Sequence, residues 1–161
     1  MPSADFELWH ALYTLEVRYW YDVDFNDGRN AHLFYLTDCA FAVGENEFRG
    51  QDRIREFYAW RQARGTATVR SIRSTRHLVS NLLVEASGPQ EAKATGVISF
   101  YEAPGRAPVM ESKPPILMAD LESHCVLQDD QTWRFKSHVL RPVFMGDDVP
   151  LSLAFDLSRS A

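Results

Sequence analysis

The sequence predicts an α+β protein in which N-terminal helices pack on one face of a strongly curved antiparallel sheet. Helix-like spacing of apolar residues dominates the first 63 residues, whereas alternation of apolar and polar residues takes over after Arg64-Gly65. Turn-rich segments divide the alternating part into long strand candidates. Helices followed by a run of strands are typical of the α+β class, because successive strands joined by short turns pair antiparallel.

Length and composition bound the kind of protein. The 161 residues suit one domain spanning 1–161, with 146–161 as a C-terminal tail. The formal net charge of −5 argues against a nucleic-acid partner, since phosphate binding needs a concentrated basic face. No apolar run approaches the roughly 18 residues of a membrane span, and the N-terminus lacks the layout of a signal peptide. Cys39 and Cys125 form no CxxC pair, which favours a reduced, cytoplasmic compartment and argues against zinc.

The first element is a long amphipathic helix, predicted over residues 5–24. Its apolar stripe ends in a carboxylate, because Asp24 falls in the same helical arc as Trp20. Burying an ionised carboxylate alone is costly, so Asp24 is expected to find a partner at the mouth of a cavity that the stripe lines. Asp22 lies at the opposite rim of the arc and is the less favoured carboxylate. The stripe comprises Phe6, Trp9, Tyr13, Val17 and Trp20.

Two polar residues lie on the broad apolar face of this helix. Glu16 falls near its middle, where an ion pair, a contact between subunits and a catalytic role all stay open. Tyr19 is either a core tyrosine with a satisfied hydroxyl or a group that reaches the cavity.

The remaining elements follow from turn residues and periodicity. Asn26-Asp27-Gly28 ends the first helix, and Thr37-Asp38 ends a short second one. The tail alternates apolar and polar residues and is expected to cover a partner subunit or the mouth of the pocket. The predicted ranges are 29–36 and 51–63 for the further helices, and 40–43, 47–48, 67–86, 91–103, 116–128 and 132–144 for the strands.

Four short motifs occur in a characteristic order. They are Tyr-x4-Asp at 19–24, Phe-x-x-Thr-Asp at 34–38, Thr-Arg-His-Leu-Val-Ser-Asn at 75–81, and Trp-Arg-Phe at 133–135 leading to Arg-Pro-Val-Phe. Their order and spacing resemble the SnoaL-like branch of the NTF2-like superfamily over about residues 5–145. The resemblance implies a cone, in which a bent antiparallel sheet wraps around the long helix and leaves a pocket at its wide end.

Within that superfamily the chain looks most like the hydro-lyases and dehydrochlorinases that use an Asp-His dyad, such as bile acid 7α-dehydratase, scytalone dehydratase and the lindane dehydrochlorinase. Asp24 and His77 fall at the motif positions of the dyad. Tyr19 and Arg141 match a further tyrosine and arginine of the bile acid dehydratase. The resemblance therefore implies a catalytic set of Asp24, His77 and Tyr19, with Arg141 at the substrate and no metal or organic cofactor.

The chemistry of these side chains fits that implication. An imidazole accepts and returns a proton near neutrality, and a carboxylate on its other nitrogen fixes the tautomer and is expected to raise the pKa of His77. Such a base removes a proton next to a carbonyl or a leaving group, while Tyr19 donates to the departing or developing oxygen. The outcome is elimination of water or an acid, or a shift of a double bond. A lone strand histidine is more often structural, so that reading of His77 stays open.

Strand alternation places the candidate arginine. Arg141 shares a face of the last strand with Trp133, and this face is expected to point inward. An inward arginine can anchor a carboxylate or an oxyanion of the substrate. The alternative is a structural ion pair of Arg141 with Glu16 or Asp24.

The same alternation places the other polar candidates. Asn81 shares a face with His77, and we expect Asn81 and Trp20 to contact the substrate. The other histidines are expected at the surface, which leaves no set of three metal ligands. These are His10, His32, His124 and His138.

The leading hypothesis is a cofactor-independent lyase or isomerase acting on a small, largely apolar cyclic or polyketide-like molecule. The ten Phe, six Tyr and four Trp residues suit a ring as substrate. One alternative is the non-catalytic small subunit of an aromatic-ring dioxygenase, although no Trp-Met-Pro-like run follows Thr37-Asp38. Another is a small-molecule binding module. The resemblance also implies a homo-oligomer, either a dimer or a trimer.

Overall fold

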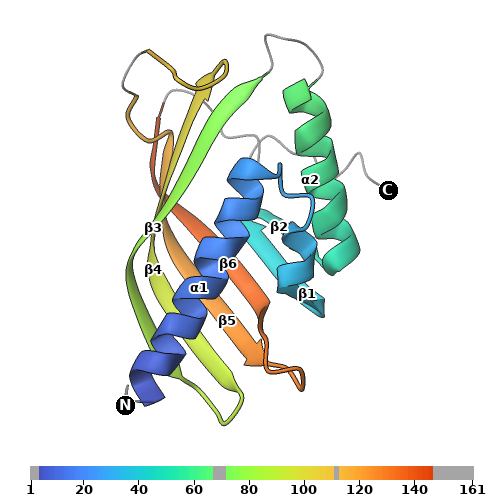
Figure 1. The fold of residues 1–161 in the computed structure, drawn as a ribbon, viewed down its shortest axis with the longest axis vertical. Coiled ribbons are helices and arrows are strands. Elements are labelled where there is room, and N and C mark those ends of the chain that lie inside the picture. The colour runs from blue at the N-terminus through green and yellow to red at the C-terminus, as the bar shows by residue number, and fades with distance from the viewer. Residues whose placement is uncertain (1–3, 67–71, 111–112, 147–161) are drawn as a thin grey trace.

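The computed structural model describes residues 4–66, 72–110 and 113–146. In these ranges two α-helices pack on a curved sheet that does not close (Figure 1), which confirms the predicted α+β class. The predicted cover by the tail beyond Gly146 lies outside the described residues. The elements are α1 (Ala4–Phe25), the 3₁₀ helix η1 (Ala31–Phe34), β1 (Tyr35–Val43), β2 (Asn46–Arg49), α2 (Gln51–Thr66), β3 (Arg73–Ala86), β4 (Glu91–Pro104), β5 (Leu117–Leu127) and β6 (Trp133–Met145).

The described strands form a six-stranded sheet in the order β2-β1-β6-β5-β4-β3. β3 to β6 pair antiparallel, as the short connections between them favour. β1 and β6 instead run parallel, so the expectation of a purely antiparallel sheet is wrong. Parallel neighbours need a long connection, which α2 and the intervening strands supply.

The first strand starts earlier than the sequence pattern predicts. β1 begins at Tyr35, so Thr37 and Asp38 lie inside the strand and do not end a helix. The predicted second helix is reduced to the single turn of η1. A short apolar run is compatible with helix and strand alike, and here the pairing of Tyr35 with Phe135 of β6 favours the strand.

The two helices and the sheet enclose the core. α1 runs along one face of the sheet in contact with β3, while α2 lies beside β1 and β2 (Figure 1). Tyr19 of α1 is fully buried at the centre of this arrangement. Its ring makes edge-to-face contacts with aromatic rings of the sheet, namely Tyr35, Phe41 and Phe135.

The buried side of α1 is displaced from the predicted stripe. Phe6, Tyr13 and Val17 are exposed, although the pattern counted them as core. The arc of apolar residues on α1 is so broad that periodicity alone does not define the side that meets the sheet. The buried positions are Leu12, Leu15, Glu16, Tyr19, Trp20 and Val23.

A register shift in the pairing of β5 with β6 exchanges the two faces of β6. Phe135 faces the core before the shift, whereas His138 and Leu140 face it afterwards and Arg141 faces solvent. One extra residue has this effect because side chains alternate with a period of two. Two predictions are wrong for this reason: His138 is fully buried, and Arg141 is exposed.

Candidate active site

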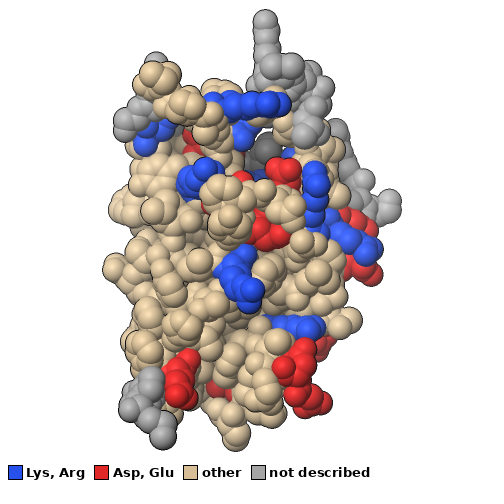
Figure 2. Space-filling model, viewed as in Figure 1, with Lys and Arg blue, Asp and Glu red and all other residues tan. Residues whose placement is uncertain are grey.

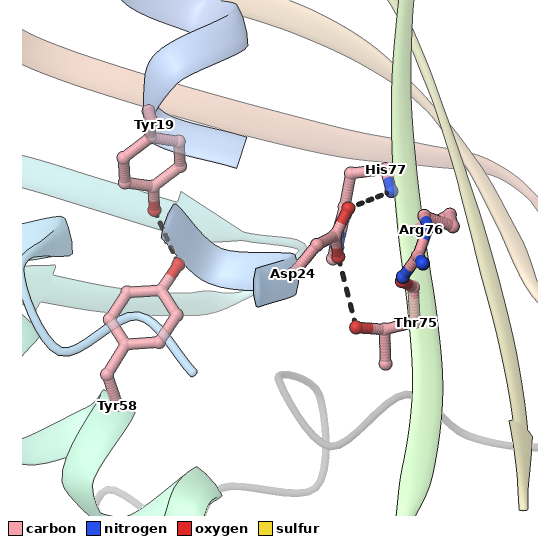
Figure 3. Close-up of polar contacts among 6 residues, drawn as sticks. All are labelled: Tyr19, Asp24, Tyr58, Thr75, Arg76 and His77. Carbon is pink, nitrogen blue, oxygen red and sulfur yellow. Dashed lines mark hydrogen bonds and ion pairs between the residues drawn. The ribbon is translucent and has the colours of Figure 1, made fainter. Parts of the chain in front are cut away.

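The last turn of α1 brings Asp24 against the first half of β3 (Figure 3). Its Oδ1 accepts hydrogen bonds from His77 Nδ1 at 2.7 Å and from the Thr75 hydroxyl at 3.0 Å. Its Oδ2 accepts a hydrogen bond from the backbone N–H of His77 at 2.7 Å. The side chains of His77 and Asp24 are only 8% and 4% exposed. The two residues of the predicted dyad therefore meet in a buried contact.

The hydrogen bonds define the protonation of this pair. Burial alone would raise the pKa of Asp24, but the bonds from His77 and Thr75 outweigh it and hold the pKa below its usual value. Asp24 is therefore a carboxylate that accepts from Nδ1–H of His77. None of the described residues hydrogen-bonds to the other ring nitrogen, Nε2, whose lone pair remains available.

The pKa of His77 moves in the opposite direction to the prediction. Burial lowers it, the hydrogen bond and charge of Asp24 oppose that only in part, and the nearby charge of Arg61 lowers it further. The expected rise is thus wrong, because desolvation of the imidazolium outweighs the attraction of one carboxylate. His77 is neutral near pH 7, which is the form that accepts a proton.

Two aromatic rings hold the His77 imidazole on both faces. Trp20 stacks on one face with centroids 4.4 Å apart, and Phe100 of β4 stacks on the other at 4.2 Å. The planes are nearly parallel, at 19° and 8°. The ring therefore cannot swing away from Asp24 without breaking this stack, and Trp20 lies against the candidate base. The predicted contact of Trp20 with a substrate stays a prediction.

Two adjoining cavities border the dyad. The inner one, of about 30 Å³, has an apolar wall that includes Trp20 and Phe100, and His77, Tyr58 and Arg61 also line it. The outer one, of about 280 Å³, is open to solvent and more polar. Arg61 lines both cavities. The outer cavity is bordered by Val23, Asp24, Asp27, Arg61, Gln62, Gly65, Ile72, Arg73, Thr75, Glu102 and Arg106.

Tyr58, and not the predicted Tyr19, is among the residues that line the inner cavity. The hydroxyls of Tyr19 and Tyr58 share a hydrogen bond of 2.5 Å (Figure 3), but Tyr19 does not line the cavity. Burial raises the pKa of Tyr58 to about 12 and that of Tyr19 well above 10, so both stay protonated. Tyr19, which lies in the core, thus holds the Tyr58 hydroxyl in place by this hydrogen bond.

A glycine fixes the position of the Tyr58 ring. Gly28, in the turn after α1, has a φ of +71°, and a Cβ built there would lie 2.2 Å from Cδ1 of Tyr58. Only glycine allows both this backbone conformation and this close approach. The turn that follows Asp24 therefore also seats the tyrosine of the neighbouring helix.

A second buried polar group lies behind the site. Glu16 is 1% exposed and accepts hydrogen bonds from the Ser123 hydroxyl and from Trp20 Nε1. Its Oε2 also lies 3.3 Å from His138 Nε2, and His138 Nδ1 shares a hydrogen bond of 2.9 Å with the Tyr35 hydroxyl. Of the alternatives for Glu16, a polar contact inside one chain is the one that fits, next to a histidine that the sequence had placed at the surface.

Two predicted substrate contacts lie away from both cavities. Arg141 is exposed and pairs with Glu122 at 3.3 Å, so its predicted inward orientation is wrong and its ion pair with Glu16 or Asp24 is not formed. Asn81 is exposed, with a φ of +53°, at the register shift between Ser80 and Leu83. Both residues lie beyond bulges, where the alternation counted from the sequence no longer holds.

The remaining histidines form no metal centre in the described part of the chain. His10 is exposed, and His124 is partly exposed and lies 3.3 Å from Glu91. His32, like His124, is partly exposed. Over the described ranges, no cluster of three or more His, Cys, Asp or Glu could hold a metal ion. Nor does any helix in those ranges have the length and apolar character to cross a membrane.

The sequence matches one family of known proteins over most of its length. Residues 4–139 match the SnoaL-like domain family. The chain belongs to the SnoaL-like family. The motif resemblance is thereby confirmed, and with it the NTF2-like fold. No curated protein matches this SnoaL-like chain in sequence.

Solved structures share the fold of this SnoaL-like chain at low sequence identity. A candidate scytalone dehydratase from Novosphingobium aromaticivorans is 21% identical, with 88% of this chain and 87% of the other covered and a TM-score of 0.67. A candidate aromatic ring hydroxylase from that organism is 14% identical, with 88% and 93% covered and a TM-score of 0.66. An NTF2-like protein with a cystatin-like fold, also from that organism, is 15% identical, with 92% and 88% covered and a TM-score of 0.69. At these identities the likeness establishes fold and not activity.

Proposed function

We propose that this chain is a cofactor-independent lyase or isomerase in which His77 is the base. The observation that carries the proposal is the Nδ1–H bond to the buried Asp24 carboxylate, which leaves Nε2 of a neutral, stacked imidazole as the proton acceptor. A carboxylate and imidazole so arranged are costly to bury for packing alone.

The proposed reaction begins with transfer of a C–H proton to Nε2 of His77. The electron pair of the broken bond moves toward an adjacent carbonyl and forms an enolate, while Asp24 stabilises the imidazolium. In an elimination the enolate then expels a neighbouring hydroxide or other leaving group, which takes a proton from the Tyr58 hydroxyl. In an isomerisation His77 returns the proton to a different carbon. Tyr58 stands at the cavity for either role.

The cavities limit the substrate to a small molecule. A volume of about 280 Å³ lies near the lower end of the range for ligand pockets, which is about 300–1,000 Å³. The inner cavity has space for roughly one or two waters and is bordered by aromatic rings. A substrate with one or two rings, placing its reacting carbon at the inner cavity, fits this shape best.

The proposal includes a homo-oligomer. Exposed apolar side chains occur on the outer side of α1. Figure 2 shows that few charged side chains interrupt this side of the molecule. The exposed apolar side chains include Phe6, Tyr13 and Val17, of which Tyr13 stacks on Trp9. Light scattering at micromolar concentration is expected to give the mass of a dimer or trimer, and a monomer would contradict this part.

Two buried free cysteines accord with the proposed cytoplasmic location.

Proton exchange with solvent tests the base before any substrate is known. Cyclic ketones incubated with the protein in D₂O are expected to gain deuterium next to the carbonyl, as seen by NMR or mass spectrometry. His77→Gln should abolish the protein-dependent exchange, whereas His124→Gln, at a partly exposed histidine of β5, should leave it unchanged. Equal exchange by the wild type and His77→Gln would refute the proposal.

A further inference from the structure

Arg61 of α2 occupies the junction between the two cavities. It lines the inner cavity beside His77 and Tyr58 and the outer cavity beside Asp24 and Thr75. Its guanidinium lies 5.9 Å from the ring centroid of Phe100, the ring that stacks on His77. Arg61 therefore faces the space in which a substrate would meet the base.

The charge of Arg61 is not neutralised by the protein within the described residues. Among the other charged groups of the outer cavity, Arg73 pairs with Glu102 at 2.8 Å and Asp27 lies 3.9 Å from Arg29. Arg106 also lines this cavity, but it is exposed to solvent, whereas Arg61 is partly buried. Asp24 is engaged by His77 and Thr75. No carboxylate of the described chain lies within ion-pair distance of Arg61. A partly buried guanidinium with five donors and no anion is costly, and a cation–π contact at 5.9 Å offsets little of that cost.

The position of this charge also opposes the proposed chemistry unless an anion joins it. Arg61 disfavours the imidazolium that forms when His77 accepts a proton, because the two charges have the same sign. A negatively charged oxygen between the guanidinium and the imidazole would be attracted by both. It would thus bind in the ground state and hold the substrate beside Nε2 during proton transfer.

We propose that Arg61 binds an anionic oxygen of the substrate, so that this cavity accepts small apolar acids, as ring carboxylates or as ionised enols and phenols. The inference rests on the proposed function, since it takes the space beside His77 as the substrate site. A planar fork of donors suits a carboxylate in particular. Arg61 takes the anchoring role that the sequence had given to Arg141.

Binding of simple probes tests this role without turnover. Benzoate, p-nitrophenolate and the neutral benzamide are titrated into the full chain, and the His77 ring signals are followed by NMR. Benzoate or p-nitrophenolate is expected to shift these signals and to bind at least tenfold more tightly than benzamide. The tighter anion of the two identifies the acid class. Failure of both anions to bind, or equal binding of benzamide, would overturn the proposal.

Variants on one helix assign the effect to Arg61. Arg61→Gln is expected to weaken binding of the anions at least tenfold and to leave benzamide unchanged. Arg64→Gln is the matched control, because Arg64 is exposed on the same helix with its guanidinium over Trp60, and binding should stay within twofold. Arg61→Lys keeps the positive charge but lacks the planar guanidinium, so it should bind the anions with an affinity between those of the wild type and Arg61→Gln. Arg61→Lys replaces Arg61→Gln in this test if the glutamine variant does not fold. Undiminished anion binding by Arg61→Gln, or by Arg61→Lys in its place, would refute the inference.

Because these titrations measure binding, they separate the two proposals. Absence of deuterium exchange with normal anion binding would refute the base and leave the anion site standing. Exchange with equal binding of benzoate and benzamide would refute the anion site and leave the base standing.

Discussion

Asp24→Asn is expected to weaken the base while leaving the fold intact. Asp24 accepts from three donors: the His77 ring, the His77 backbone and the Thr75 hydroxyl. An asparagine offers one acceptor oxygen to these donors. If that oxygen stays on the backbone N–H, the amide NH₂ faces Nδ1 and drives the imidazole proton to Nε2. The nitrogen that has to accept the substrate proton is then already protonated.

The size of this effect follows from the charge of the acceptor. A hydrogen bond to a charged group contributes about 1.5–3 kcal/mol, and losing that much stabilisation of the imidazolium slows proton transfer about 10- to 150-fold. Deuterium exchange into a cyclic ketone measures the rate, and urea unfolding shows whether the fold persists. Asp22→Asn is the matched control, because Asp22 also lies in the last turn of α1 but makes no contact with His77. Its carboxylate accepts hydrogen bonds from the Asn26 side-chain amide and from the Asn30 backbone N–H. A rate for Asp24→Asn within twofold of wild type would refute the reasoning.

Three further predictions concern the surroundings of the dyad. The pKa values of His77 and Asp24 are both lowered in the folded chain, so the unfolded chain binds more protons at acid pH. The free energy of unfolding should therefore rise with pH just below pH 6.5, where His77 titrates, and again around and below pH 4, where Asp24 titrates. In urea unfolding at a series of pH values, His77→Gln should remove the rise just below pH 6.5, and an unchanged rise would contradict the assignment. Glu16→Ala should lower the free energy of unfolding by about 1–3 kcal/mol for each of the two buried donors that lose their acceptor, Ser123 Oγ and Trp20 Nε1. Glu16→Gln should cost less, and a total loss below about 1 kcal/mol for the alanine variant would argue against the cluster. Gly28→Ala should displace Tyr58 and lower both stability and exchange. Gly88→Ala is the control, because Gly88 lies outside both cavities and a Cβ there would meet only Glu91 Cβ at 3.7 Å, so it should change neither. Equal behaviour of the two variants would contradict the close packing of Tyr58 against Gly28.

The dyad was predicted from the motif resemblance, which placed Asp24 and His77 at the positions of an Asp-His pair. Helical periodicity independently placed Asp24 at the end of an apolar arc of the first helix. Helix and strand ranges also follow from periodicity and turn residues, which is why most of them agree with the structure within a few residues. The parallel neighbours β1 and β6 carry no such local pattern.

For residues at or beyond a bulge, the face of the sheet to which the side chain points could not be predicted by counting alternate positions along the strand. One extra residue in β6 reversed the inward face, so that His138 entered the core and Arg141 left it. Asn81 lies at a similar irregularity in β3. No residue type in either stretch marks the shift, because a non-glycine bulge looks like ordinary strand in sequence.

The cavity residues of α2 were missed for a different reason. Tyr58 and Arg61 are three residues apart and so share a helix face, which was visible in the sequence. However, the contacts of that face with Tyr19 of α1 and Phe100 of β4 depend on how the chain folds, and no short-range sequence pattern predicts them. The sign of the His77 pKa shift failed likewise, since it depends on the Trp20 and Phe100 rings that exclude water.

The ¹⁵N chemical shifts of the His77 imidazole, followed from pH 8 to pH 4, test the central claim most directly. The account predicts a protonated Nδ1 and an unprotonated Nε2 at pH 7, with conversion to imidazolium only below pH 6.5. That result would establish a neutral base held by Asp24. A proton on Nε2 at pH 7, or an imidazolium that persists above pH 6.5, would contradict it.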